Sequence, residues 1–315
     1  MRVEFRATNI FDALPINEQI RACYKTVITT FVDQVAQSID VSKLSAIIIP
    51  EDFIAEVIAF QESIGEKPSV TKNGYAEALG KMLYDRNQDA YYVFLDSCIA
   101  QYILSDDLIA FFSQGVNQDT YLSRRKSALN MLAHEMVHIS IYERIWAHNE
   151  IRSKSILSYL AAICFDEYCA CRISNSLVID PLKSSNHNQI CELEKLIASE
   201  RDKYKSQRID EKQFADILFQ YTELILKYMV YYIGAQHGQE QHNIDYAEGY
   251  IATVAPMFSR KLHRLFETTK AEESLTYKVI SDLIVLYFDI MGIQMVEYES
   301  GFAIGIKEKR SQKNQ

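Results

Sequence analysis

Two histidines and a glutamate, in the order His134-Glu135-Met136-Val137-His138, are the residues of this chain best suited to metal chemistry. Each residue of a helix advances by about 100°, so His134 and His138 lie within about 40° of one another and about 6 Å apart along the axis. Two imidazoles at that spacing can hold one zinc ion. Glu135 lies about 100° from His134, outside the ligand row but within reach of a water on the metal. The spacing therefore predicts two ligands, His134 and His138, and a general base, Glu135.

The helix expected to carry this motif runs from Ser123, a suitable N-cap, to about His148. Between Ala128 and Tyr142 it is apolar on nearly every face, which is typical of a helix that crosses the protein interior. Burying a polar group without a partner costs about 1–3 kcal/mol. The motif therefore indicates a bound metal. The alternative is that its three polar side chains pair with other groups of the core.

A third ligand has to come from another element, because Ile141 and Arg144 occupy the positions of the glycine and the histidine in the longer pattern HExxHxxGxxH. A second apolar helix, expected at Ser155–Ser176, offers Asp166 and Glu167. The helical neighbours of Glu167 cannot pair with its charge: Ile163, Cys164, Ala170 and Cys171. We expect Glu167 to complete the site. An inter-helical salt bridge is the alternative for Glu167, and Asp166 is either the ligand in its place or an acceptor that orients a histidine.

The two segments together resemble a known family. His134-Glu135-Met136-Val137-His138 followed by Glu167-Tyr168-Cys169-Ala170 is similar to the HExxH…ExxA pattern of gluzincin metallopeptidases. The resemblance implies that Glu167 is the third zinc ligand and that a small residue one turn later lets the two helices approach. Within that group, the chain looks most like the compact ImmA/IrrE-type cytoplasmic peptidases. The resemblance covers roughly 90–176, and Val137 and Cys171 depart from it, since the relatives usually have glycine and often have asparagine there.

These residues predict a zinc-dependent peptidase that binds one Zn²⁺ and hydrolyses peptide bonds through a metal-activated water, with Glu135 as the general base. Two other functions remain open. The first is a regulatory or binding protein with a non-catalytic zinc site, although such a site has no use for Glu135 and usually has four cysteine-rich ligands. The second is a zinc hydrolase that acts on a non-peptide substrate.

Composition limits the partners. The net charge is −9 and the pI is about 5.4, which argues against a general nucleic-acid binder. The longest apolar stretches contain charged residues, so we expect no membrane span. The opening residues have no apolar signal region, and the six cysteines have no disulfide-like spacing. We therefore expect a cytoplasmic protein whose partner is a peptide or protein substrate. The family resemblance suggests that this substrate is a regulatory protein.

The rest of the sequence predicts a helix-dominated α+β fold. A small sheet packs on the motif helix and on the glutamate helix, and an all-helical C-terminal region follows. The expected strands are 44–50 and 90–96, the expected helices include 15–39, 51–64 and 99–112, and a hairpin of 294–299 and 302–306 closes the chain. Pro15 is expected in the first turn of its helix. The strand 90–96 is expected either at the sheet edge, where it can pair with an extended substrate, or in the sheet interior.

A change of composition near residues 177–189 predicts a domain boundary, because Pro181 and a polar run interrupt the helical pattern there. We expect residues 1–180 to form a metallopeptidase-like catalytic domain. Residues 189–315 are expected to form a helical region that provides the other wall of a cleft.

Overall fold

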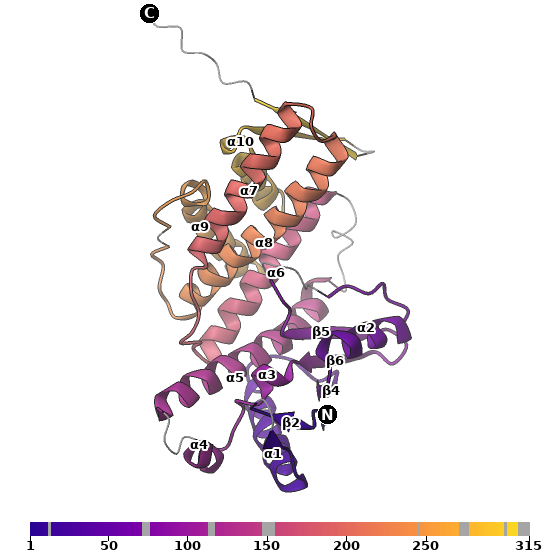
Figure 1. The fold of residues 1–315 in the computed structure, drawn as a ribbon. Coiled ribbons are helices and arrows are strands. Elements are labelled where there is room, and N and C mark those ends of the chain that lie inside the picture. The colour runs from indigo at the N-terminus through magenta and orange to yellow at the C-terminus, as the bar shows by residue number, and fades with distance from the viewer. Residues whose placement is uncertain are drawn as a thin grey trace, which may run out of the picture. The chain divides into compact units, whose positions relative to one another are not determined.

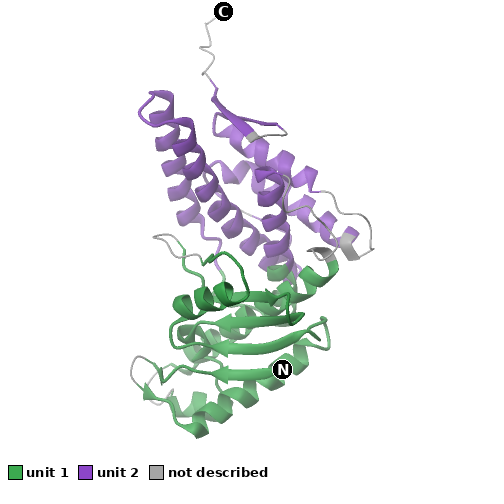
Figure 2. Ribbon diagram, turned by 90° about the vertical axis from the view of Figure 1, so that its right-hand side faces the viewer, with its two compact units in different colours: residues 1–148, 170–183 green, residues 149–169, 184–315 purple. Residues whose placement is uncertain are grey.

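The computed structural model describes residues 1–11, 14–70, 76–112, 117–146, 155–244, 246–270, 277–298 and 301–307. Helices predominate and accompany a small mixed sheet, which confirms the helix-dominated α+β class (Figure 1). The chain divides into two compact units (Figure 2): unit 1 comprises residues 1–148 and 170–183, and unit 2 comprises residues 149–169 and 184–315. Within these described ranges, no helix combines the length and the apolar character that a bilayer crossing requires.

The elements of unit 1 follow one another as β1 (Arg2–Phe5), β2 (Asn9–Ile10), β3 (Leu14–Pro15), α1 (Glu18–Val35), β4 (Leu44–Ile49), α2 (Phe53–Ser63), β5 (Gly80–Asp85), β6 (Ala90–Leu95), α3 (Ser97–Ala100), α4 (Asp106–Phe112), α5 (Gln118–Ile141) and a π-helical turn, η1 (Tyr142–Trp146). Helix α6 (Ile156–Leu177) begins in unit 2 and ends in unit 1. Unit 2 continues with α7 (His187–Lys205), α8 (Glu211–Gly238), α9 (Ile251–Lys270), α10 (Lys278–Ile290), β7 (Ile293–Tyr298) and β8 (Gly301–Ile306).

The main sheet has the strand order β1-β4-β6-β5. Strands β1, β4 and β6 are parallel, whereas β5 pairs antiparallel with β6 and lies at the end of the sheet. The two predicted strands, β4 and β6, are present and adjacent, with Ile47 opposite Val93. Of the two positions left open for the strand 90–96, the sheet edge is wrong and the sheet interior is confirmed, because β6 lies between β4 and β5.

Both faces of this sheet are buried, and alternate residues of β4 divide between them. Ile47 and Ile49 pack in one cluster with residues of α1 and α5, whereas Ala46 and Ile48 pack in a second cluster with Phe53 of α2 and its neighbours. Figure 1 shows these helices beside the strands. Burial on both sides accounts for the continuous apolar run of β4, which is typical of a parallel strand. The sheet thereby supports α5, the helix that carries the motif.

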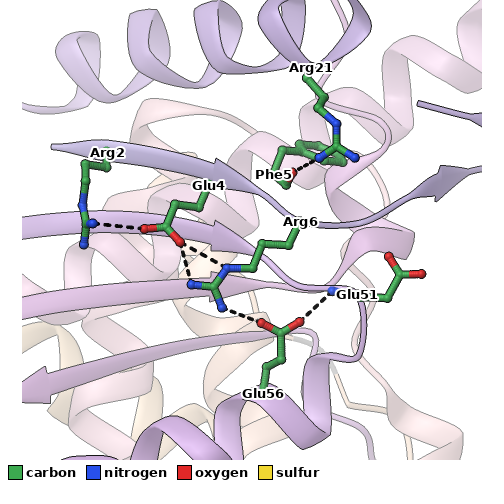
Figure 3. A network of polar contacts seen from close by, with 7 residues as sticks. All are labelled: Arg2, Glu4, Phe5, Arg6, Arg21, Glu51 and Glu56. Atoms are coloured by element: carbon green, nitrogen blue, oxygen red, sulfur yellow. Dashed lines mark hydrogen bonds and ion pairs between the residues drawn. The ribbon is translucent and has the colours of Figure 1, made fainter. Parts of the chain in front are cut away.

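The strand β1 is tied to the neighbouring helix α2 by a surface network (Figure 3). The Arg6 guanidinium contacts Glu4 and also Glu56 of α2, at 2.5 Å and 2.6 Å. The second oxygen of Glu56 accepts a hydrogen bond from the backbone N–H of Glu51 at 2.8 Å. Exposed ion pairs contribute about 0–1 kcal/mol each, so this network directs the chain where β4 ends rather than stabilising the core.

Three expectations about the helices require correction. Helix α1 begins at Glu18, because Asn17 caps it by accepting a hydrogen bond from the N–H of Ile20, and Pro15 instead pairs with Asn9 in β3. The helix expected at 99–112 is two short helices, α3 and α4, because the chain turns between residues 101 and 105. The motif helix begins at Gln118 with Asn117 as its N-cap, so Ser123 lies inside it.

The terminal hairpin is confirmed as β7 and β8, although its turn at residues 299 and 300 lies outside the described residues. One boundary between the two units falls within residues 177–189, the region in which we expect a domain boundary. That residues 1–180 fold as a domain of their own stays a prediction.

A buried carboxylate organises unit 2. Glu194 of α7 is 3% exposed and accepts hydrogen bonds from the backbone N–H groups of Tyr250 and Ile251, at 2.8 Å and 2.7 Å, and from the Tyr287 hydroxyl at 2.8 Å. It therefore caps the start of α9, where backbone donors lack partners. Gly249 lies at φ +86°, and a Cβ there would collide with a Glu194 oxygen, so glycine is required for this approach.

Burial raises the pKa of Glu194 above its ordinary value, and this outweighs the hydrogen bonds that lower it. The folded protein therefore holds the Glu194 proton to a higher pH than the unfolded chain does. The contribution of Glu194 to the free energy of unfolding should decrease as pH rises from the unfolded-state pKa through the higher folded-state pKa. Chemical denaturation of the wild type and Glu194→Gln at several pH values from about 4 to about 7 measures this. The stability difference, wild type minus variant, should fall with rising pH; a constant or rising difference would contradict the assignment.

Candidate metal centre

Helix α5 places the motif at the point where its surroundings are most apolar. Ala133, Met136 and Val137 are fully buried beside the motif residues, and Glu135 is 9% exposed. The two histidines are half-buried. The same helix packs on the sheet through Leu132 and Met136. The motif residues are therefore fixed by packing, and the two histidines keep partial access to solvent.

The two imidazoles converge as the helical spacing predicts. The Nε2 atoms of His134 and His138 are 3.1 Å apart, and their ring centroids are 4.7 Å apart. Two nitrogens bound to one zinc at about 2.0–2.1 Å in tetrahedral geometry would be about 3.3 Å apart. The pair of nitrogens therefore fits a shared metal ion.

Glu167 of α6 completes this group. The ligand atoms of His134, His138 and Glu167 all lie within 4.8 Å of one another, and the three side chains are half-buried. Among the described residues, no other group of three metal-ligating side chains meets these distances, so Asp166 lies outside the set. Adjacent residues of a helix are about 100° apart, which explains why only one of the two carboxylates can belong to it. The three side chains can hold a metal ion.

The segment just after α6 is attached to α5 by part-buried polar contacts within unit 1. The Asn130 amide donates to the carbonyl of Val178 at 2.6 Å, and the Ser127 hydroxyl donates to Asp180 at 2.7 Å. Ala170, in the part of α6 that belongs to unit 1, is fully buried. These contacts attach the end of α6 to α5 within unit 1.

Cys171 is a site residue whose role the sequence does not indicate. Its Sγ lies 3.6 Å from Nδ1 of His134, on the side of the ring opposite to the nitrogen that faces His138. If Nε2 of His134 binds a metal ion, Nδ1 would keep the proton and would donate it toward the sulfur, which would fix the ring orientation. The cysteine is 1% exposed.

Replacing Cys171 with alanine should weaken zinc binding by about tenfold, because partners that orient a ligand typically contribute about 10–100-fold to metal affinity. Zinc affinity measured by chelator competition tests this. The matched control is Cys169→Ala, which removes an equally buried thiol about 200° away on the same helix. An equal loss in both variants would mean that packing of the helix, and not the contact with His134, is responsible.

Glu167 also has a cationic neighbour in unit 2. Burial lowers the pKa of Lys227, but the nearby carboxylates of Glu167 and Glu223 outweigh burial and raise it above its ordinary value. The Lys227 ammonium lies 2.8 Å from Glu223. The sequence analysis left a salt bridge open as the alternative role of Glu167, and Lys227 is a cation available for it. A ligand role and this charge interaction are compatible, because a carboxylate has two oxygens.

The described part of the chain also contains a histidine cluster in unit 2 that is not part of the metal group. His237 is 4% exposed, and its two ring nitrogens lie 2.7 Å from the Tyr168 hydroxyl and 2.9 Å from the Ser259 hydroxyl. The rings of His242 and His263 pack against it with centroids at 5.1 Å and 5.5 Å. Because both nitrogens of His237 have partners, we interpret the cluster as structural.

The π-helical turn η1 follows α5 directly. Glu143 in this turn accepts a hydrogen bond from the Tyr91 hydroxyl of β6 at 2.5 Å and lies 3.0 Å from the Lys43 ammonium. These contacts anchor the end of the motif helix to the sheet.

In comparisons with known proteins, no protein-family model, no curated protein and no solved structure matches the chain.

Proposed function

We propose that this protein is a zinc-dependent peptidase of the HExxH…E type. The observation that supports the proposal most is the convergence of His134, His138 and Glu167, whose ligand atoms lie within 4.8 Å of one another. Glu135 lies on α5, the helix that carries the two histidines. Within the described residues, no hydrogen bond or ion pair holds the Glu135 carboxylate. A site that served only to bind metal has no use for a carboxylate at this position, whereas a hydrolase needs one there as a general base.

The ligand chemistry supports zinc as the metal. Two imidazole nitrogens and one carboxylate oxygen form a typical catalytic zinc set that leaves a fourth position open. A zinc ion bound there would polarise a substrate carbonyl and lower the pKa of a bound water toward about 7. Cys171 holds His134 in the orientation that this role needs.

Glu135 carries the proton in this proposal. Its carboxylate takes a proton from the attacking water, which forms the bond to the carbonyl carbon. It then delivers that proton to the leaving amine nitrogen as the C–N bond breaks. Burial of Glu135 beside Met136 and Val137 limits the water around it, which strengthens electrostatic interactions in the site.

Strand β5 is the element best placed to align a substrate. It lies at the end of the sheet, its first residue is next to Glu135, and it packs against α5. An extended peptide can add to such an edge by backbone hydrogen bonds. In this proposal β5, and not the strand 90–96, pairs with the extended substrate.

The substrate in this proposal is a restricted set of proteins in the cytoplasm, because an unselective peptidase there would degrade its host. The helical region after residue 189 is proposed to select it. The family resemblance suggests a regulatory protein as the substrate.

The test uses the purified full-length protein loaded with zinc. It is incubated with unfolded casein and, separately, with a host-cell proteome, and new N-termini are identified by mass spectrometry. Samples without zinc and samples of Glu135→Gln are the controls. We expect a few zinc-dependent cleavages in the proteome and little digestion of casein. Rapid digestion of casein would contradict the restriction, and no zinc-dependent cleavage of either substrate would contradict the peptidase.

A further inference from the structure

We propose that Gly80, the first residue of β5, is a positioning residue that keeps the Glu135 carboxylate in its catalytic place. A Cβ atom at this position would lie 2.8 Å from Oε1 of Glu135, 2.9 Å from its Cγ and 3.1 Å from its Cδ. Carbon atoms in contact are normally about 3.5–4.0 Å apart. Glu135 therefore occupies the space that any other residue at position 80 would fill. This inference rests on the proposed function, since it assigns a role to Glu135.

The backbone at Gly80 does not itself require glycine. Three other glycines of the described chain, at positions 65, 249 and 292, have positive φ angles, whereas Gly80 does not. Its conformation is open to any residue of the L series. The requirement for glycine therefore comes from the Glu135 side chain alone.

Pairing with β6 holds the strand at Gly80. Gly80 pairs with Leu95, which is fully buried in β6, and the N–H of Asp96 donates to the carbonyl of Leu79 at 2.8 Å. The strand is thus bound to the neighbouring strand at Gly80 and at the residue before it. Glu135 is itself 9% exposed. A methyl group at position 80 would consequently displace the carboxylate, the flexible partner of the contact.

Displacement of a general base has a specific kinetic signature. A misplacement of about 1 Å can lower the rate by about 10²-fold. Gly80→Ala should therefore reduce kcat by about 10- to 100-fold. Its effect on KM should be small, and zinc affinity should stay within about twofold of the wild type, because no ligand moves.

The matched control is Gly305→Ala in β8. Gly305 is also a strand glycine, and the nearest atoms to a Cβ there are 3.8 Å away, so the methyl group fits. This variant should retain the kcat of the wild type. It separates the contact with Glu135 from the general effect of replacing a strand glycine.

A second measurement is independent of catalysis. Urea denaturation of the metal-free protein is compared for Gly80→Ala in the wild-type background and in a Glu135→Ala background. In the wild type, the added methyl group should lower the urea midpoint, because it clashes with Glu135. In Glu135→Ala the same change should leave the midpoint unchanged or raise it, since alanine restricts the unfolded chain more than glycine does.

The results distinguish the two proposals. If the wild type cleaves no substrate, the peptidase is wrong, and the denaturation cycle still decides whether Gly80 and Glu135 are coupled. If the wild type is active, a kcat for Gly80→Ala equal to that of Gly305→Ala would overturn the positioning role. Equal midpoint shifts in the two backgrounds would overturn it as well.

Discussion

Substituting glutamine for Glu135 should lower the rate of peptide hydrolysis by about 10²–10⁴-fold, the usual contribution of a general base. Glutamine is nearly the same size and occupies the same buried position, but it cannot accept the proton of the attacking water. Because Glu135 lies outside the ligand group of His134, His138 and Glu167, zinc affinity should hardly change. Initial rates with a cleaved protein substrate and zinc titration on the same preparation measure both effects.

Two results would count against the assigned roles. Release of zinc by Glu135→Gln as complete as that caused by His134→Ala would make Glu135 a ligand. Full activity of Glu135→Gln would place the base elsewhere. The unfolding free energy of the metal-free variant is the control that its fold is intact.

Loss of any one ligand should remove the stabilisation that zinc provides. Zinc at about 100 times its dissociation constant stabilises a folded protein by about 2.7 kcal/mol. The wild type should gain that amount. The variants His134→Ala, His138→Ala and Glu167→Ala should gain little, because two remaining ligands bind zinc weakly. Asp166→Ala should respond to zinc as the wild type does, since Asp166 lies outside the group.

Lys227 supplies the decisive comparison for Glu167. If Glu167 only neutralises this ammonium, Lys227→Met and Glu167→Ala should both change the stability of the metal-free protein, and both should retain the response to zinc. If Glu167 is a ligand, only Glu167→Ala should lose that response. Chemical denaturation with and without zinc distinguishes these cases.

The parts of the fold that the sequence predicts are those with a strong local pattern. The apolar helices around His134 and Glu167 are present, as are the strands β4 and β6, because burial on both faces leaves a continuous apolar run. The residues of the metal group can also be predicted from local sequence patterns. The i, i+4 spacing fixes the two histidines, and the apolar neighbours of Glu167 on α6 indicate that its partner lies on another element.

The features that the sequence missed depend on contacts between distant segments. Strand β5 is only half-buried and begins with glycine, so it lacks the pattern of a strand, yet pairing with β6 stabilises it. The contact of Cys171 with His134 depends on how α6 crosses α5, and that of Gly80 with Glu135 depends on where β5 meets α5. Several polar residues can cap the start of α5, and the sequence does not decide between Asn117 and Ser123.

The π-helical turn after the motif also bears on the ancestry of the chain. A π turn closes its hydrogen bonds from residue i to i+5, and therefore accommodates one residue more than an α turn. An insertion at Tyr142–Trp146 falls after His138 and leaves the spacing of the two histidines unchanged. The same insertion between His134 and His138 would rotate the second histidine by about 100° and abolish the ligand pair. Within this helix, length variation among descendants of a common ancestor is therefore expected in η1, and the segment before it should keep a constant length.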